Sequence, residues 1–367
     1  MTSENPGSGS LDLPDLASRS LRGSVIAASD EFFAEKENLI SPAAAAFSPH
    51  TFGHKGQVYD GWETRRRRGS GRSLPADGEH DWVVVRLGAP GVVHAVVVDT
   101  KHFTGNFPQA CSVEACWADG YPDLAALETA RWAEIVQRSP LQGDTAHVFE
   151  LPPSARRRYS HVRLRIYPDG GVARLRVHGA VVPDPALLER MTFDLAALEN
   201  GADVVACSDR FYSSPRNAIS PGLSRVMGEG WETRRRRTTG NEWLAVRLTA
   251  PALVTLVEVD TSGYIGNSPG MAELRGSLSA GRATGDGAGE PSRASAWDEA
   301  TSWHPLLERT PLLPDTPHRF RIAPGAPCDL VRLDVFPDGG VARLRLYGSL
   351  TPEGLAQIRR RWAETAP

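Results

Sequence analysis

The sequence predicts an all-β protein made of two tandem β-sandwich domains, and three observations carry this prediction. The chain has 367 residues, which exceeds the size at which a single hydrophobic core usually stops growing. An identical segment, Gly-Trp-Glu-Thr followed by four arginines, occurs at Gly61–Arg68 and again at Gly230–Arg237. Short runs of alternating apolar and polar residues, bounded by glycine and proline, indicate antiparallel strands.

A second segment, Pro168–Arg176, recurs without change at Pro337–Arg345. Both matches share one offset in sequence, and a shared offset indicates an internal duplication in which each copy is a folding unit. We therefore expect a first domain at about residues 11–190 and a second at 191–367. Residues 1–10 are expected to be a disordered lead-in.

The strands of the first domain can be followed in order. Residues 81–87 and 92–99 are rich in β-branched residues, which is typical of strands. Residues 162–167 and 172–178 alternate apolar and polar residues on either side of Pro-Asp-Gly-Gly, which predicts two strands joined by a tight turn.

Helical signal is confined to short peripheral pieces, at residues 194–199 and 354–362. Several short antiparallel strands per copy favour a sandwich or jelly roll over a parallel α/β sheet.

Composition argues against some classes of function. The net charge of −3 and the pI near 6.4 disfavour a general nucleic-acid or anionic-membrane partner, which would normally select a basic chain. No apolar run approaches the roughly 18 residues that a membrane-spanning helix needs. The N-terminal residues show neither the basic nor the apolar region of a signal peptide.

The four cysteines have no Cys-x-x-Cys spacing and are too few for a disulfide framework in a chain of this length. We expect buried, reduced thiols in a cytoplasmic protein. The cysteines are Cys111, Cys116, Cys207 and Cys328.

The arginine runs follow Gly-Trp-Glu-Thr at the same place in both copies, which does not fit a nuclear-localisation signal. If this segment is a strand, Arg65 and Arg67 point to one face, and Arg66 and Arg68 to the other. The run is then either a solvated strand or a clamp for an anion, because guanidinium groups bind carboxylates with two hydrogen bonds.

The loop after Asp99 differs between the copies. It carries Lys101 and His102 in the first copy, where the second has Ser262 and Gly263. A purely structural requirement would have kept similar residues in both, so the difference favours the first copy as the place of chemistry.

The other histidines point to structure rather than catalysis. His147 and His318 are equivalent, each after Asp-Thr, and are expected to stabilise turns. His50 and His54 have the spacing of metal ligands only in a helix, which the neighbouring proline and glycine disfavour. We therefore assign no metal ligands.

With these motifs assembled, the chain resembles the allantoicase (allantoate amidinohydrolase) family over about residues 22–350. The segments that carry the resemblance are residues 29–34, 37–40, 60–68, 99–108 and 168–176.

The resemblance implies two tandem jelly-roll domains similar to galactose-binding-like modules, with short peripheral helices. It also implies a homo-oligomer and a hydrolase that converts allantoate to ureidoglycolate and urea in purine catabolism. In the family pattern the fuller Asp-Thr-Lys-x-Phe-x-Gly-Asn segment is expected in the second repeat. Here it stands in the first, at residues 99–106.

Such a reaction needs cations for the substrate carboxylate, a general acid for the departing ureide and a base for water. The candidates for proton transfer are His102, Glu63 and Asp169. The candidates for substrate binding are Arg65, Arg67, Lys101, Asn106 and Arg174. The sequence requires no cofactor and leaves a divalent metal open.

Two other functions fit the same motifs. The first is a non-catalytic tandem module that binds carbohydrate or another ligand, because fold alone does not separate binding from catalysis. The second is a ureidoglycolate lyase, which shares the substrate class and would leave the architecture unchanged.

Overall fold

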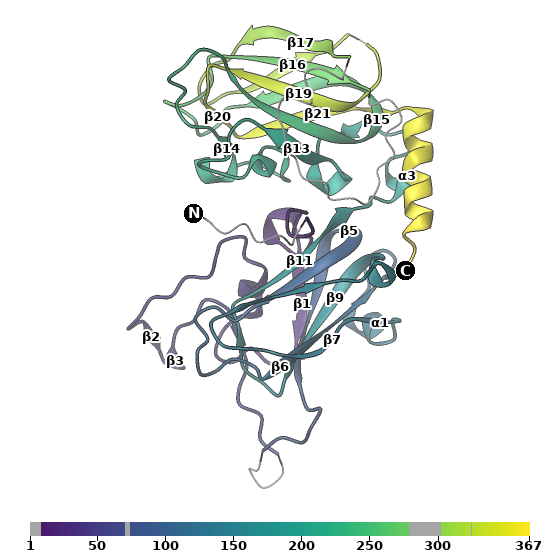
Figure 1. The fold of residues 1–367 in the computed structure, drawn as a ribbon. Helices are drawn as coiled ribbons and strands as arrows, with labels where there is room; N and C mark the ends of the chain where they lie inside the picture. Colours follow the sequence, from purple (N-terminus) through teal and green to yellow (C-terminus); the bar gives the residue numbers. More distant parts are fainter. Residues whose placement is uncertain (1–8, 70–73, 279–301, 324) are drawn as a thin grey trace. The chain divides into compact units, whose positions relative to one another are not determined.

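The computed structural model describes residues 9–69, 74–278, 302–323 and 325–367. Most of the lead-in expected at residues 1–10 lies outside them. The chain divides into two compact units, Met1–Val181 with Thr365–Pro367, and Val182–Glu364. This division falls before the boundary expected at residue 190. Antiparallel strands form most of each unit (Figure 1).

The first unit is a sandwich whose two layers share one long strand. Its strands are β1 (Ser24–Ala28), β2 (Phe52–Gly53), β3 (Gly56–Gln57), β4 (Trp62–Glu63), β5 (Asp81–Asp99), β6 (Ala110–Cys116), β7 (Ala133–Pro140), β8 (Ala146–Glu150), β9 (Arg158–Tyr167), β10 (Gly171–Val172) and β11 (Arg174–Val181). The first half of β5 pairs with β1 and β9, and the second half with β8 and β11. The two strands expected at 81–87 and 92–99 are therefore the two halves of β5.

The second unit repeats this plan around β15. Its strands are β12 (Phe193–Asp194), β13 (Asp203–Cys207), β14 (Trp231–Glu232), β15 (Glu242–Asp260), β16 (Met271–Ser277), β17 (His304–Pro311), β18 (Pro317–Arg321), β19 (Cys328–Phe336), β20 (Gly340–Val341) and β21 (Arg343–Leu350). The first half of β15 pairs with β13 and β19, and the second half with β18 and β21. The expected all-β fold of two tandem jelly-roll repeats is confirmed.

The prediction of a hairpin around Pro168-Asp-Gly-Gly is wrong. β9 pairs with the first half of β5 and with β6, whereas β11 pairs with the second half of β5. The turn therefore carries the chain from one layer to the other. An alternating pattern shows that each strand has one buried face, but it does not select the partner strand.

The arginine run, considered above as a possible strand, does not form one. β4 ends at Glu63, and residues 64–69 have no regular structure. The backbone N–H groups of Arg65 and Arg67 donate to carboxylates and not to a neighbouring strand. Side-chain carboxylates thus replace the strand partner that a longer ladder would need.

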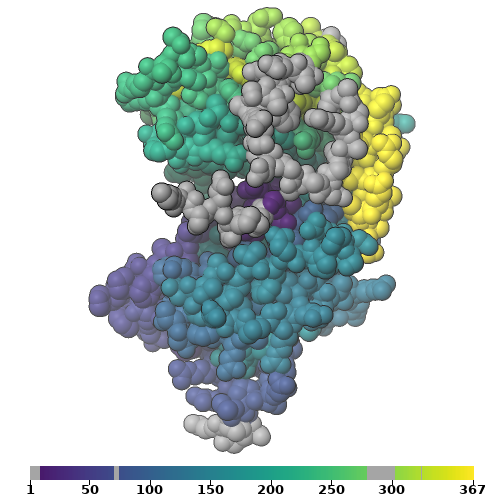
Figure 2. Space-filling view, in the orientation of Figure 1, coloured from purple at the N-terminus to yellow at the C-terminus, as the bar shows by residue number. Residues whose placement is uncertain are grey.

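Helices are few in the described residues. They are α1 (Leu124–Glu128), α3 (Pro352–Glu364) and the short 3-10 helices η1 (Arg19–Leu21), η2 (Lys36–Ile40), η4 (Pro153–Ala155), η5 (Pro185–Leu187), η6 (Leu198–Asn200), η7 (Pro215–Ile219) and η8 (Met227–Glu229). The helix expected at 354–362 is confirmed as α3, one face of which is exposed (Figure 2). At 194–199 the prediction is wrong, because β12 ends at Asp194 and only η6 is helical. None of these helices is long and apolar enough to cross a membrane.

The four cysteines are free thiols. Burial raises the pKa of the Cys111, Cys116 and Cys328 thiols to about 12, which keeps them protonated and unreactive. The expectation of reduced thiols is confirmed for all four, and that of burial for these three, since Cys207 is partly exposed.

One buried histidine makes the stability of the first unit depend on pH. His161 of β9 is 1% exposed and pairs in register with Arg86 of β5 and Cys116 of β6. Burial, followed by repulsion from Arg86, lowers the pKa of His161 from 6.5 to about 4. In the second unit Leu330 occupies the corresponding position, paired with Arg247.

We expect the free energy of unfolding to fall as the pH drops from 6.5 towards 4. The unfolded chain takes up a proton on His161 in this range, whereas the folded chain does not. The pKa difference corresponds to a loss of about 3 kcal/mol in the free energy of unfolding between pH 6.5 and pH 4. His161→Leu, which copies the second unit, should remove this part of the pH dependence in urea unfolding at pH 7 and pH 5. Parallel curves for the two proteins would contradict the expectation.

Candidate functional site

Three segments meet at one end of the first unit and form a rigid base for the site. β4 pairs with β10, and the Asn106 carbonyl accepts the Gly171 N–H at 2.7 Å. Thr64 exchanges backbone and side-chain hydrogen bonds with Gly170. A Cβ at Gly171 would lie 2.0 Å from the buried ring of Phe103, so only glycine allows this approach.

Glu63 and Asn106 form a polar pair on this base. The Asn106 Nδ2 donates to Glu63 Oε1 at 2.8 Å. Burial raises the pKa of the Glu63 carboxyl, and the Asn106 hydrogen bond and the Arg66 charge offset this only in part. Because Oε1 accepts from Asn106, a proton on this carboxyl resides on Oε2. Glu63 is therefore arranged to hold a proton at a higher pH than an ordinary glutamate and to present it on a defined atom.

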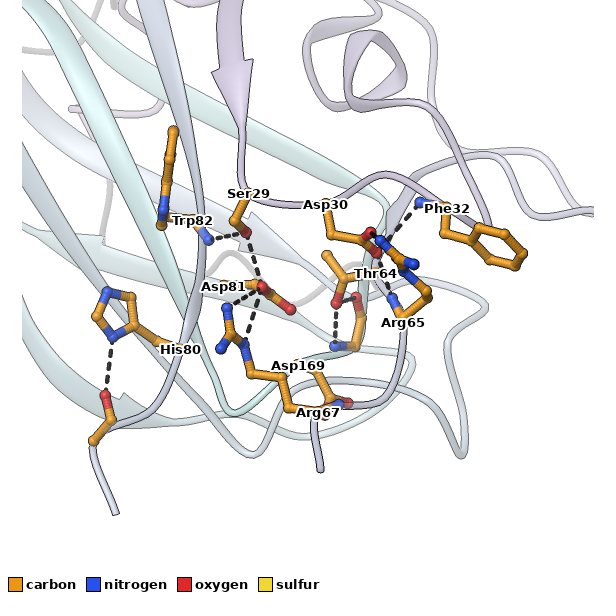
Figure 3. A network of polar contacts seen from close by, with 12 residues as sticks. Ser29, Asp30, Phe32, Thr64, Arg65, Arg67, His80, Asp81, Trp82 and Asp169 are labelled. Carbon is orange, nitrogen blue, oxygen red and sulfur yellow. Dashed lines mark hydrogen bonds and ion pairs between the residues drawn. The ribbon is translucent and has the colours of Figure 1, made fainter. Parts of the chain in front are cut away.

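Carboxylates engage the guanidinium groups of Arg65 and Arg67 (Figure 3). Arg65 Nε donates to Asp30 Oδ1 at 2.8 Å, and Arg67 Nη2 donates to Asp81 Oδ1 at 2.7 Å. The Asp81 carboxylate also accepts from the Ser29 hydroxyl. These two arginines are consequently neutralised by protein carboxylates.

Asp169 accepts the Arg67 N–H at 2.6 Å. Burial and repulsion from Asp81 raise the pKa of Asp169, while Arg66 and Arg67 act in the opposite direction. Asp169 is thus a second carboxyl with a raised pKa at the same end of the unit.

Arg66, like Arg68, is not among the residues predicted to bind substrate. Its side chain is exposed, and among the described residues it has no hydrogen-bond or ion-pair partner. Its charge acts on both Glu63 and Asp169. The alternation of a strand put Arg65 and Arg67 together but could not show that carboxylates would neutralise them. Arg66 is the cation left available to an anionic ligand beside the two carboxyls.

His102 has a left-handed backbone with φ of +70°, which is costly for any residue except glycine. Its N–H donates to Asp144 Oδ1, its ring stacks on Phe47, and Nε2 lies 3.2 Å from the Ala45 carbonyl oxygen. In the second unit Gly263 occupies this position with φ of +84°, and its N–H donates to Asp315 Oδ1. The first unit therefore keeps an imidazole where the backbone favours glycine, and strain of this kind is typical of functional positions.

Lys101 precedes His102, and its Nζ lies 3.1 Å from Asp144 Oδ1. These residues form a second group, separate in its contacts from Glu63 and Asn106. Phe103 links the two groups, because its ring packs on Gly61 and Gly171 and stacks on Tyr59.

The expectation that Arg174 binds substrate is not supported by the geometry. The side chain is 2% exposed, and its five N–H donors are taken up by the Ala43, Ala44, Asp60 and Ala173 carbonyl oxygens and by Asp60 Oδ2. Arg174 therefore holds residues 43–60 against β11. A buried arginine in a repeated motif has the same sequence signal as a binding arginine, so the sequence could not separate the two.

The turn-stabilising role expected for His147 and His318 is confirmed. His147 Nε2 accepts the Gln142 N–H at 2.8 Å and its Nδ1 faces the Val98 carbonyl oxygen. His318 repeats both contacts with Leu313 and Val259.

Within the described ranges no group of three or more His, Cys, Asp and Glu side chains could hold a metal ion. A groove of about 210 Å³ in the first unit contains none of the predicted site residues. It is lined by His80, Trp82, Val84, Leu124, Leu127, Glu128, Trp132, Arg163 and Arg165.

Comparison with known proteins gives consistent matches. The sequence model of the allantoicase repeat matches residues 14–182 and 193–351. A protein of Nocardia farcinica described as a probable allantoicase is 53% identical over 344 residues, which cover 93% of this chain and 96% of the relative. The allantoicase of Dictyostelium discoideum is 38% identical over 345 residues, which cover 92% of this chain and 87% of the relative.

A solved structure agrees with these matches. The crystal structure of allantoicase from Saccharomyces cerevisiae superposes with a TM-score of 0.73 at 31% sequence identity. The superposition covers 92% of this chain and 93% of the yeast chain.

Proposed function

The chain belongs to the allantoicase family, and from this premise we propose that its first repeat carries out the family reaction, the hydrolysis of allantoate to ureidoglycolate and urea. The enzyme class is that of hydrolases acting on C–N bonds in linear amidines. The observation that favours the first repeat over the second is the His102 imidazole, which stands where the second repeat has Gly263. Arg66, an available cation, and Glu63, a carboxyl of raised pKa, supply the other groups that the reaction needs.

Arg66 is proposed to hold the substrate carboxylate. A carboxylate needs a guanidinium whose donors are not already engaged. Arg65 and Arg67 are bound to Asp30 and Asp81, so we assign them to shaping the rim of the site. Lys101 lies on the neighbouring loop, but its ammonium is paired with Asp144 at 3.1 Å, so the carboxylate is assigned to Arg66.

Glu63 is proposed as the general acid. Urea leaves intact, so the bond broken is the one between the central carbon and a ureido nitrogen. Glu63 Oε2 donates its proton to this nitrogen as the bond breaks, and Asn106 keeps the carboxyl oriented.

His102 is proposed as the base that takes a proton from water. When Nε2–H donates to the Ala45 carbonyl, Nδ1 carries the lone pair, and no described residue is bonded to Nδ1. The water oxygen then bonds to the central carbon that the ureide leaves. Asp169, with its raised pKa, is assigned to relaying protons at the Glu63 end.

The reaction is tested by incubating the purified protein with allantoate and measuring urea and ureidoglycolate. We expect the two products in equal amounts. If allantoate is left unchanged and separately added ureidoglycolate is consumed with release of urea, the protein is a lyase. If no urea forms and the protein binds a sugar array, the ligand-binding alternative holds.

Arg66→Ala should raise KM for allantoate by about 10- to 100-fold, the loss expected for one charge-assisted contact of roughly 1.5–3 kcal/mol. Arg68→Ala is the matched control, because Arg68 is exposed in the same run and removes the same charge. Steady-state kinetics at low ionic strength would compare the two. Equal effects on KM would mean that only the general positive charge of the run matters.

We further propose that the protein acts in the cytoplasm as a homo-oligomer. Free, buried thiols fit a reducing compartment. Membership of the family supports the oligomer, which light scattering of the purified chain would test.

A further inference from the structure

The second repeat keeps the polar framework of the proposed site. Asn267 Nδ2 donates to Glu232 Oε1 at 2.7 Å, which matches the Asn106–Glu63 pair. The Arg236 N–H donates to Asp338 Oδ2 at 2.6 Å, which matches Arg67 and Asp169. These contacts involve partly buried groups, so packing alone could account for them.

Exposed side chains of the second repeat are harder to explain by packing. Arg235, the counterpart of Arg66, is exposed and has no hydrogen-bond or ion-pair partner in the described part of the chain. Beside the run lie Phe211 and Tyr212, which are 57% and 60% exposed, and Arg234 stands over the Phe211 ring at 4.3 Å. Arg235 is exposed and more than half of each of these side chains is open to solvent, so packing does not account for them.

The same exposed group occurs in the first repeat. Phe32 and Phe33 form an edge-to-face pair with ring centroids 5.1 Å apart, and Phe211 and Tyr212 form one at 4.8 Å. Arg65 stands over Phe32 as Arg234 stands over Phe211. Two exposed aromatic rings beside a cation suit a ligand that combines a negative charge with flat, weakly polar groups.

What the second repeat lacks is the group assigned to proton transfer from water. Ser262 and Gly263 stand where the first repeat has Lys101 and His102. Glycine adopts the left-handed backbone conformation without strain, but it supplies no imidazole. The binding features therefore remain without the base.

We propose that the second repeat is a separate, non-catalytic binding site for a ureido carboxylate, centred on Arg235 and the Glu232–Asn267 pair. The ligand class rests on the function proposed for the first repeat. Each chain then holds two such sites, one that turns the ligand over and one that only retains it.

Equilibrium dialysis of allantoate against the full chain carrying Glu63→Gln, which slows turnover, tests this proposal. We expect two sites per chain. Adding Arg235→Ala should remove one, and adding Arg66→Ala should remove the other. Arg237→Ala, an equal loss of charge at a neighbouring exposed position, should leave two.

A single site whose number is unchanged by Arg235→Ala would overturn the proposal. This outcome is distinct from failure of the proposed function. If the proposed function fails, the unmodified protein makes no urea and Arg66→Ala removes no site. This holds whether or not Arg235→Ala removes a site.

Discussion

Replacing Glu63 by glutamine is expected to lower kcat for allantoate by about 10²- to 10⁴-fold, the usual contribution of a general acid. Glutamine keeps the shape of the side chain, and its carbonyl oxygen can still accept the Asn106 amide hydrogen. It has no acidic proton to give to the departing nitrogen. Steady-state kinetics with a thermal melt would separate loss of chemistry from loss of fold.

The pH profile gives this prediction a second test. Burial raises the pKa of Glu63, so the protonated acid persists to a higher pH than usual. The rate should fall as the pH rises through this pKa, because the ionised carboxylate cannot donate. In Glu63→Gln that limb of the profile should be missing. A variant that keeps both the rate and the limb would exclude Glu63 as the acid.

Replacing His102 by glycine should also remove most of the turnover, again by about 10²- to 10⁴-fold for a lost base. Stability should not fall with it. The backbone at this position is left-handed, and glycine relieves a cost of about 1–2 kcal/mol. The lost stacking on Phe47 offsets part of this gain.

His318→Ala is the control for His102→Gly. The His318 ring fixes a turn in the second unit through the Leu313 N–H and the Val259 carbonyl, so its loss should lower the melting temperature while turnover persists. His102→Gly should therefore lose turnover and keep its melting temperature, whereas His318→Ala should keep turnover and melt at a lower temperature. If His102→Gly melts well below the unmodified protein and retains its rate, His102 is structural.

The duplication and the strands could be predicted because they depend on local pattern and on self-similarity. The layer change after Tyr167 could not, because alternation does not name a partner strand. The left-handed backbone at His102 had a signal in the sequence, namely the glycine at position 263 in the other copy.

The roles of the arginines depend on contacts that are distant in sequence. Arg174 is hydrogen-bonded to residues 43–60, and Arg67 is paired with Asp81. Neither contact leaves a local pattern in the sequence. Four arginines in a row look equivalent in the sequence. The positions of the carboxylates show that Arg65 and Arg67 are engaged, and that Arg66, unlike the exposed Arg68, acts on Glu63 and Asp169.

The central claim is that the first repeat performs the hydrolysis. Its most direct test is to measure urea release from allantoate by Glu63→Gln and by Glu232→Gln, the same change at equivalent positions of the two repeats. We expect the loss for Glu63→Gln to exceed the loss for Glu232→Gln by at least tenfold. Equal losses, or a larger loss for Glu232→Gln, would contradict it.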